Sequence, residues 1–151
     1  LNMLNREPQQ EGIIDYCAEH GIGFISFSPL AQGLLTDRYL NGIPEGSRMS
    51  KEKFLRHDML TPELLEHLQQ LNKQAEERGE TLAEMALSWI LQQKGVTSVL
   101  VGASSVEQLE KNLKCLRLFK MLLQIALLHR AIPEKYQQAM VLQRQHIFNS
   151  L

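Results

Sequence analysis

Two stretches of this chain place a hydroxyl residue directly after an apolar, β-favouring run. The first run, residues 24–27, stops at Ser28 and Pro29 and leads into a loop that contains glycine. A strand end of this kind can present backbone N–H groups and a hydroxyl to an anion. Arg38 and Arg48 lie on the same loop, where a guanidinium can hold a pyrophosphate with paired hydrogen bonds. These residues predict a phosphate-binding loop; a solvated loop with ordinary surface arginines is the alternative interpretation.

The second apolar run ends at Gly102 and passes directly into a helix that Ser104 or Ser105 begins. The free N–H groups and the positive dipole end of such a helix form a ready anion site. Gln108 and Asn112 lie one turn apart on one face of the helix, where their amides can hydrogen-bond a base or a ribose. The alternative interpretation is a simple capped helix, in which the serine serves only the cap.

Periodicity and capping residues predict the elements that position these two segments. Thr61 followed by Pro62 is typical of a helix start, and Thr81 with Glu84 forms a capping box. The order strand, loop, two helices, strand favours parallel strands whose carboxyl ends share one face, where α/β proteins bind ligands. We expect buried strands at 24–27 and 96–101, a short strand at 1–5, a long loop at 28–60, and helices at 9–20, 62–78, 82–94 and from 105 onward.

Bulk composition narrows the class of protein. At 151 residues with a net charge of −1, the chain suits one globular domain and carries no general signal for nucleic-acid binding. The two cysteines, Cys17 and Cys115, are not in a metal-binding or redox spacing, which favours a reducing compartment. No signal peptide and no run long enough to span a membrane is visible. We therefore expect a cytoplasmic protein without a membrane or nucleic-acid partner.

The charge pattern divides the chain at about residue 113. Residues 1–112 hold ten Lys or Arg and sixteen Asp or Glu, whereas residues 113–151 hold six Lys or Arg and one acid, Glu134. The second segment is first apolar without a clean helical face and then rich in glutamine. We expect residues 1–112 to form the ordered domain and residues 113–151 to form a helical or disordered tail.

Four separated motifs, taken together, resemble the aldo-keto reductases, and most closely the branch with the potassium-channel β subunits and the bacterial glyceraldehyde-3-phosphate reductases. Each motif alone is common, but all four occur in the order and spacing of that family. They are FSPLAQGLLTDRY at 27–39, GIPEGSR at 42–48, MALSW at 85–89 and VTSVLVGASSVEQLEKN at 96–112.

The resemblance implies the family's (β/α)8 barrel, of which this chain looks like the C-terminal part. Residues 1–5, 24–27 and 98–101 would then be strands six, seven and eight. The resemblance also implies NADP(H) as cofactor. The matching contact residues are Ser28, Pro29 and Leu30 at the pyrophosphate, Arg38 and Arg48 on the loop beside it, Gly102 and Ser104 at the adenosine phosphate, and Gln108 and Asn112 near that phosphate and the adenine.

The family's reaction is hydride transfer from NADPH to a small aldehyde or ketone, with a tyrosine as general acid. The family's catalytic Asp, Tyr, Lys and His lie on earlier strands, which have no equivalent in this sequence. We therefore assign no catalytic residue and no metal ligand. Two positions beside the expected cofactor also depart from relatives: Asp37 replaces a common glycine and Lys111 replaces a glutamate.

Three functions remain open from the sequence. The chain is part of an NADPH-dependent reductase and inactive alone, or it is a nucleotide-binding or protein-interaction half-barrel, or it is a non-functional remnant of a disrupted gene. A half-barrel leaves strand edges open, which would favour self-association.

Overall fold

The computed structural model describes residues 1–47, 49–50 and 55–116. The chain divides into two compact units, Leu1–Cys115 and Leu116–Leu151. Of the second unit only Leu116 is among the described residues, so the predicted tail at 113–151 lies largely outside them.

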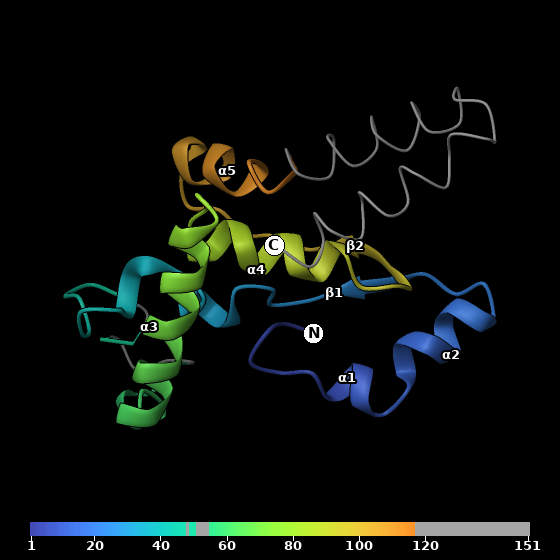
Figure 1. Ribbon diagram of the computed structural model, residues 1–151, viewed down its shortest axis with the longest axis horizontal. Helices are drawn as coiled ribbons and strands as arrows, with labels where there is room; N and C mark the ends of the chain where they lie inside the picture. The colour runs from blue at the N-terminus through green and yellow to red at the C-terminus, as the bar shows by residue number, and fades with distance from the viewer. Residues whose placement is uncertain (48, 51–54, 117–151) are drawn as a thin grey trace. The chain divides into compact units, whose positions relative to one another are not determined.

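The first unit contains helices, 3-10 turns and a pair of strands (Figure 1). Its elements are, in chain order, α1 (Glu7–Gln10), α2 (Ile13–Glu19), β1 (Phe24–Ser26), the 3-10 turns η1 (Ala31–Gly33), η2 (Asp37–Tyr39) and η3 (His57–Met59), α3 (Pro62–Glu77), α4 (Leu82–Leu91), β2 (Val96–Val99) and α5 (Val106–Leu113).

The two strands are parallel and adjacent, which confirms the predicted strand order and direction. Phe24 is opposite Val96, and Ser26 is opposite Val99. The backbone N–H of Leu100 donates to the Ser26 carbonyl at 2.9 Å, which extends the pairing by one residue beyond β2. The strands are shorter than predicted: residues 27, 100 and 101 lie outside them, because the chain turns into loops directly after Ser26 and Val99.

The prediction that both strands are buried is wrong. Successive strand residues point to opposite faces of a sheet. On one face Phe24 and Val99 pack with Ile14 from α2 and Ile90 from α4. On the other face Ile25 is 63% exposed and is covered by no described element. The run at residues 24–27 therefore has apolar side chains on both faces of the strand. The described residues cover only one of these two faces.

Two predictions near the start of the chain are also wrong. Residues 1–5 form no strand, because the Asn2 side chain accepts hydrogen bonds from the N–H groups of Leu4 and Asn5 and closes a turn. The single helix expected at 9–20 is two helices, α1 and α2. They are separated at Gly12, whose φ of 73° lies in the left-handed region that breaks a helix.

The two central helices follow the sequence signals. The Thr61 hydroxyl accepts from the N–H of Leu64 at 3.2 Å and begins α3. At the start of α4, Thr81 and Glu84 accept from each other's backbone N–H and complete the predicted capping box. Three residues of α3 and three of α4 pack into the main core: Leu68, Leu71, Ala75, Leu82, Met85 and Ala86.

The described residues between β1 and α3 (27–47, 49–50 and 55–61) contain more regular structure than the loop that the sequence predicts at 28–60. They form three 3-10 turns, and they contribute fully buried side chains at Leu35, Tyr39 and Met49. These residues belong to the same core as α3 and α4. The segment after β1 is therefore anchored in the core and can hold a defined conformation.

We predict that Thr81→Ala lowers the free energy of unfolding of the 151-residue chain by about 1 kcal/mol, because it removes one half of a complete capping box. Urea unfolding followed by circular dichroism measures this change. Ser98→Ala is the matched control, since the exposed Ser98 hydroxyl makes no hydrogen bond within the described part of the chain. Equal stability of the two variants would contradict the capping role.

Candidate functional site

The loop that follows β1 has an unusual backbone conformation where the sequence predicts phosphate binding. Three residues other than glycine have positive φ: Ser28 at 50°, Ala31 at 46° and Gln32 at 60°. Such residues are uncommon and cluster at ligand sites. The N–H groups of Ala31, Gly33, Leu34 and Leu35 donate to carbonyls within the loop. The Ser28 hydroxyl and the Leu30 N–H have no partner among the described residues, and both could donate to an anion.

This loop is held in place by a residue that the sequence analysis did not single out. The Asn2 side-chain nitrogen donates to the Ser28 carbonyl at 3.0 Å, and the N–H of Ala31 donates to the same carbonyl at 3.0 Å. Pro29 is buried, and Leu30 packs against the main core. Asn2 could have been noticed as a polar residue inside an apolar segment, but its partner 26 positions away is visible only in three dimensions.

Arg38 is available to a ligand. It lies on η2, where the Thr36 hydroxyl accepts from its backbone N–H at 3.2 Å. Its side chain is exposed and has no hydrogen-bonding or ionic partner within the part of the chain that the structure describes. The other predicted arginine, Arg48, lies outside the described residues.

The second predicted segment begins α5 with a fully defined cap. The Ser105 hydroxyl accepts from the N–H of Gln108 at 3.1 Å, so Ser105 rather than Ser104 is the N-cap. The Gln108 side-chain oxygen accepts from the N–H and the hydroxyl of Ser104, at 2.7 and 2.9 Å. Gly102 is exposed beside them. The acceptor of Gln108 is therefore used within the protein, which leaves its amide nitrogen for a ligand.

Asn112 is the clearest unsatisfied polar group of this segment. It is 5% exposed, and its side-chain nitrogen is buried without a hydrogen-bond partner. A buried donor left unpaired costs about 1–3 kcal/mol. Because this nitrogen is buried, a nucleotide base could pair it only if the Asn112 side chain turned outward.

The structure brings the two predicted segments together on one side of the sheet. They leave the same ends of adjacent parallel strands, joined by the hydrogen bond between Leu100 and Ser26. On α5, Glu107 accepts a hydrogen bond from Lys111 in an ion pair of 2.8 Å, which raises the pKa of Lys111, and the Asp37 carboxylate on η2 raises that pKa further. The loop after β1 and α5 are thus close enough to interact electrostatically.

Phe27 is a second residue at this site that the sequence analysis missed. It lies between β1 and Ser28, and it is 71% exposed. The apolar run made it look like a core residue of the strand. An exposed aromatic ring beside an anion-binding loop can instead stack on a planar ring of a bound ligand.

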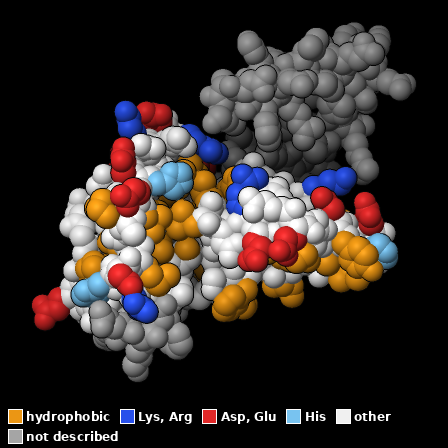
Figure 2. Space-filling model, turned by 90° about the horizontal axis from the view of Figure 1, so that it is seen from below, with side chains coloured by type: hydrophobic (Ala, Val, Ile, Leu, Met, Phe, Trp, Pro, Cys, Tyr) orange, Lys and Arg blue, Asp and Glu red, His pale blue; other side chains and the backbone are white. Residues whose placement is uncertain are grey.

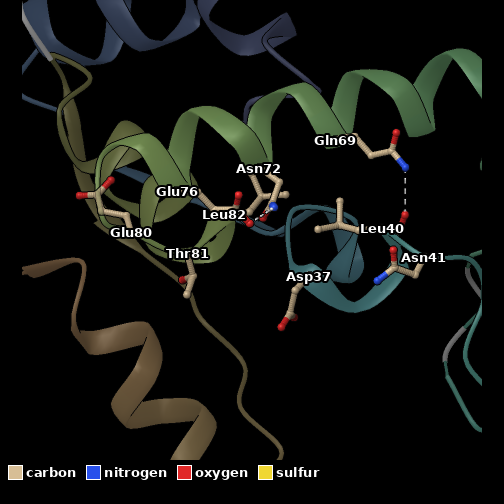
Figure 3. A pocket seen from close by; sticks show the side chains of 9 residues that line it. All are labelled: Asp37, Leu40, Asn41, Gln69, Asn72, Glu76, Glu80, Thr81 and Leu82. Atoms are coloured by element: carbon tan, nitrogen blue, oxygen red, sulfur yellow. Dashed lines mark hydrogen bonds between the residues drawn. The ribbon is translucent and has the colours of Figure 1, made fainter.

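One pocket among the described residues is not formed by the predicted site. It has a volume of about 490 Å³ and is shown in Figure 3. Two hydrogen bonds join residues that line this pocket: the Asn72 amide donates to the Glu76 carboxylate, and the Gln69 amide donates to the Leu40 carbonyl. Three carboxylates line it and would repel a phosphate. Its lining residues are Asp37, Leu40, Asn41, Gln69, Asn72, Glu76, Glu80, Thr81 and Leu82.

The described residues lack two features, a metal-binding cluster and a helix able to span a membrane. No group of three or more His, Cys, Asp or Glu side chains there is placed to hold a metal ion. None of the described helices has the length and apolar character to cross a membrane.

Comparison with known proteins identifies the family to which this fold and site belong. Residues 1–125 match the model of the aldo/keto reductase family. The chain therefore belongs to that family, as the four motifs predict.

Similar curated proteins come from the branch that the motifs predict. Two Escherichia coli proteins named L-glyceraldehyde 3-phosphate reductase are 52% and 50% identical over 119 residues, which cover 76% of this chain and 34% of each relative. A probable voltage-gated potassium channel subunit beta of Arabidopsis thaliana is 34% identical over 129 residues, or 83% of this chain and 39% of that protein. This chain thus spans about a third of the length of the reductases that it matches.

A solved structure supports the fold. It is a thermostable aldo-keto reductase in complex with the inhibitor epalrestat, and it superimposes with a TM-score of 0.53 at 22% identity. The match covers 78% of this chain and 32% of that protein. The parallel strands and helices of this chain accordingly correspond to part of a (β/α)8 barrel.

The ion pair between Glu107 and Lys111 on α5 should control how the Glu107 carboxyl titrates. The Lys111 ammonium lowers the pKa of the Glu107 carboxyl, first through their hydrogen bond and then through charge. Because the folded-state pKa is lowered, the pair stabilises α5 above the ordinary carboxyl pKa and loses that effect as pH falls through the lowered value. We expect Lys111→Met to return the pKa of Glu107 toward its ordinary value, as NMR titration of the carboxyl carbon would measure.

Lys114→Met is the control for that titration, since it removes the same charge from α5 without touching the hydrogen bond to Glu107. If both variants shift the Glu107 pKa equally, the effect is general charge and not the ion pair.

Proposed function

We propose that this chain forms the part of an aldo/keto reductase barrel that holds the adenosine and diphosphate portion of NADP(H), and that the intact barrel reduces a small aldehyde or ketone. β1 and β2 then occupy the seventh and eighth strand positions of the barrel. When bound, NADPH would supply the hydride for the reduction. The residues of this chain bind and orient that cofactor. As part of the same proposal, we expect a cytoplasmic protein.

The observation that carries this proposal is the pair of donor-rich segments at adjacent strand ends. The loop after β1 can offer the Ser28 hydroxyl and the Leu30 N–H, and the exposed Arg38 guanidinium has no partner among the described residues. Donors of these kinds suit a diphosphate. The buried Asn112 nitrogen lacks an acceptor, and Gln108 keeps a free amide nitrogen. Both suit the edge of a base, Asn112 once its side chain turns outward. The proposed contacts are therefore Ser28, Pro29, Leu30, Arg38, Arg48, Gly102, Ser104, Gln108 and Asn112.

The alternative is an interaction module, and one observation favours it. Ile25 in β1, and Phe27 and Leu100 directly after the two strands, expose 63%, 71% and 58% of their surfaces. Figure 2 shows that hydrophobic side chains also reach the surface in several groups on the face that it draws. Apolar surface of this kind tends to be covered by further protein. Such a module would pair with other barrel strands or with itself.

The first test is the binding of 2′-phosphorylated ADP by the 151-residue chain, measured by isothermal titration calorimetry. We expect Arg38→Ala to weaken binding about tenfold, because one charge-assisted contact to phosphate is lost, and we expect the wild-type affinity to fall with salt. Arg48→Ala should act in the same way. Arg56→Ala is the matched control, since Arg56 is already paired with Asp58. Equal affinity of wild type and both site variants would reject the proposed phosphate contacts.

The second test concerns turnover. We predict that the 151-residue chain alone reduces no aldehyde with NADPH, because a general acid must lie within hydrogen-bond reach of the carbonyl oxygen and no residue here matches the family's tyrosine. Absorbance of NADPH at saturating aldehyde measures the rate. A rate above background that is lost on mutation of a residue within this chain would contradict the prediction.

A further inference from the structure

The inference concerns Asn2, and it rests on the proposed cofactor function. We propose that Asn2 is a positioning residue that fixes the loop after β1 in the conformation that receives the diphosphate of the cofactor. Asn2 lies outside the loop and would not touch the ligand. It acts through the carbonyl of Ser28.

The Asn2 side chain is built into the structure more firmly than a surface amide. It is 7% exposed. Its oxygen accepts from the N–H groups of Leu4 at 2.9 Å and Asn5 at 2.8 Å, and its nitrogen donates to Ser28 at 3.0 Å. Three hydrogen bonds fix the plane of the amide, so the donor can point in one direction only.

The backbone around Asn2 is also tied to β1. The Ser26 hydroxyl donates to the carbonyl of Leu1 at 2.6 Å, and both Ser26 and Asn2 are buried. The N–H of Asn2 donates to the carbonyl of Asn5 at 2.9 Å, and the turn closes on itself. The turn at residues 1–5 is therefore a fixed platform beside the strand end.

Asn2 contacts Ser28, the first residue of the loop whose φ is positive. Ser28 has φ 50°, which is unfavourable for a residue with a side chain. Its carbonyl accepts from Asn2 and from the N–H of Ala31, so both lone pairs are used. These two bonds hold the Ser28 carbonyl in one orientation at the start of the loop, directly before Pro29 and Leu30. Without the Asn2 donor, this peptide can rotate toward an unstrained conformation and turn its oxygen toward the phosphates.

The substitution Asn2→Asp tests the hydrogen-bond donor of the Asn2 side chain separately from its acceptor. An aspartate keeps the oxygen that accepts from Leu4 and Asn5, but it has no donor for the Ser28 carbonyl. Asn5→Asp is the matched control. It introduces the same charge three residues away and keeps the oxygen that accepts from the N–H of Glu7.

The experiment compares two ligands on these variants of the 151-residue chain by calorimetry. NADP⁺ requires the diphosphate loop, whereas adenosine 2′-monophosphate requires only the α5 side. We expect Asn2→Asp to weaken NADP⁺ binding about tenfold and to change adenosine 2′-monophosphate binding less than about twofold. Asn5→Asp should leave both affinities near wild type. A loss of both ligands, no loss of either, or an equal loss in Asn5→Asp would overturn the role of Asn2.

A measurement on the wild type keeps the proposal testable if Asn2→Asp does not fold. The side-chain amide signals of Asn2 in a nitrogen-15 NMR spectrum should shift when NADP⁺ binds and stay in place with adenosine 2′-monophosphate. If NADP⁺ binds without moving them, Asn2 does not position the loop. If the folded wild type binds neither ligand, the proposed cofactor function is rejected, and the role of Asn2 falls with it.

Discussion

The parallel pairing of β1 with β2 is the constraint on which the candidate site depends. It joins two segments that are about seventy residues apart, and it directs both to the same end of the sheet. The last bond of the pairing, between the N–H of Leu100 and the carbonyl of Ser26, lies directly before the two loops. A shift in register would separate the phosphate loop from α5, and neither segment alone offers enough donors to specify a dinucleotide.

The loop after β1 depends in turn on elements at both sides. The core of α3 and α4 receives Leu35 and Tyr39, and the turn at residues 1–5 holds the Ser28 carbonyl. The strain of three positive-φ residues is therefore balanced by contacts outside the loop. This arrangement explains why so long a segment contributes to the core although its described residues form no long helix or strand.

The sequence predicts best the elements whose ends are set by contacts between residues close together in the chain. Thr61, Thr81 and Glu84 fix the starts of α3 and α4 through contacts within four residues, which a sequence displays directly. The parallel order followed from the alternation of strands and helices. The family could be recognised because four motifs keep their order and spacing.

What the sequence did not reveal depends on contacts between distant residues or on uncovered surface. The apolar run at residues 24–27 predicts a buried Phe27, yet no described element covers its side chain. Asn2 was missed because its partner Ser28 is distant in the chain. The split between α1 and α2 at Gly12 was missed because the apolar periodicity continues across it.

Chemical-shift mapping of the nitrogen-15-labelled chain with NADP⁺ tests the central claim most directly. The account predicts that the largest shifts fall on two separate segments, Ser28 to Gln32 and Ser104 to Asn112, while Gln69, Asn72 and Glu76 in the acidic pocket stay in place. Shifts confined to that pocket, or no shifts in a folded chain at millimolar NADP⁺, would contradict it.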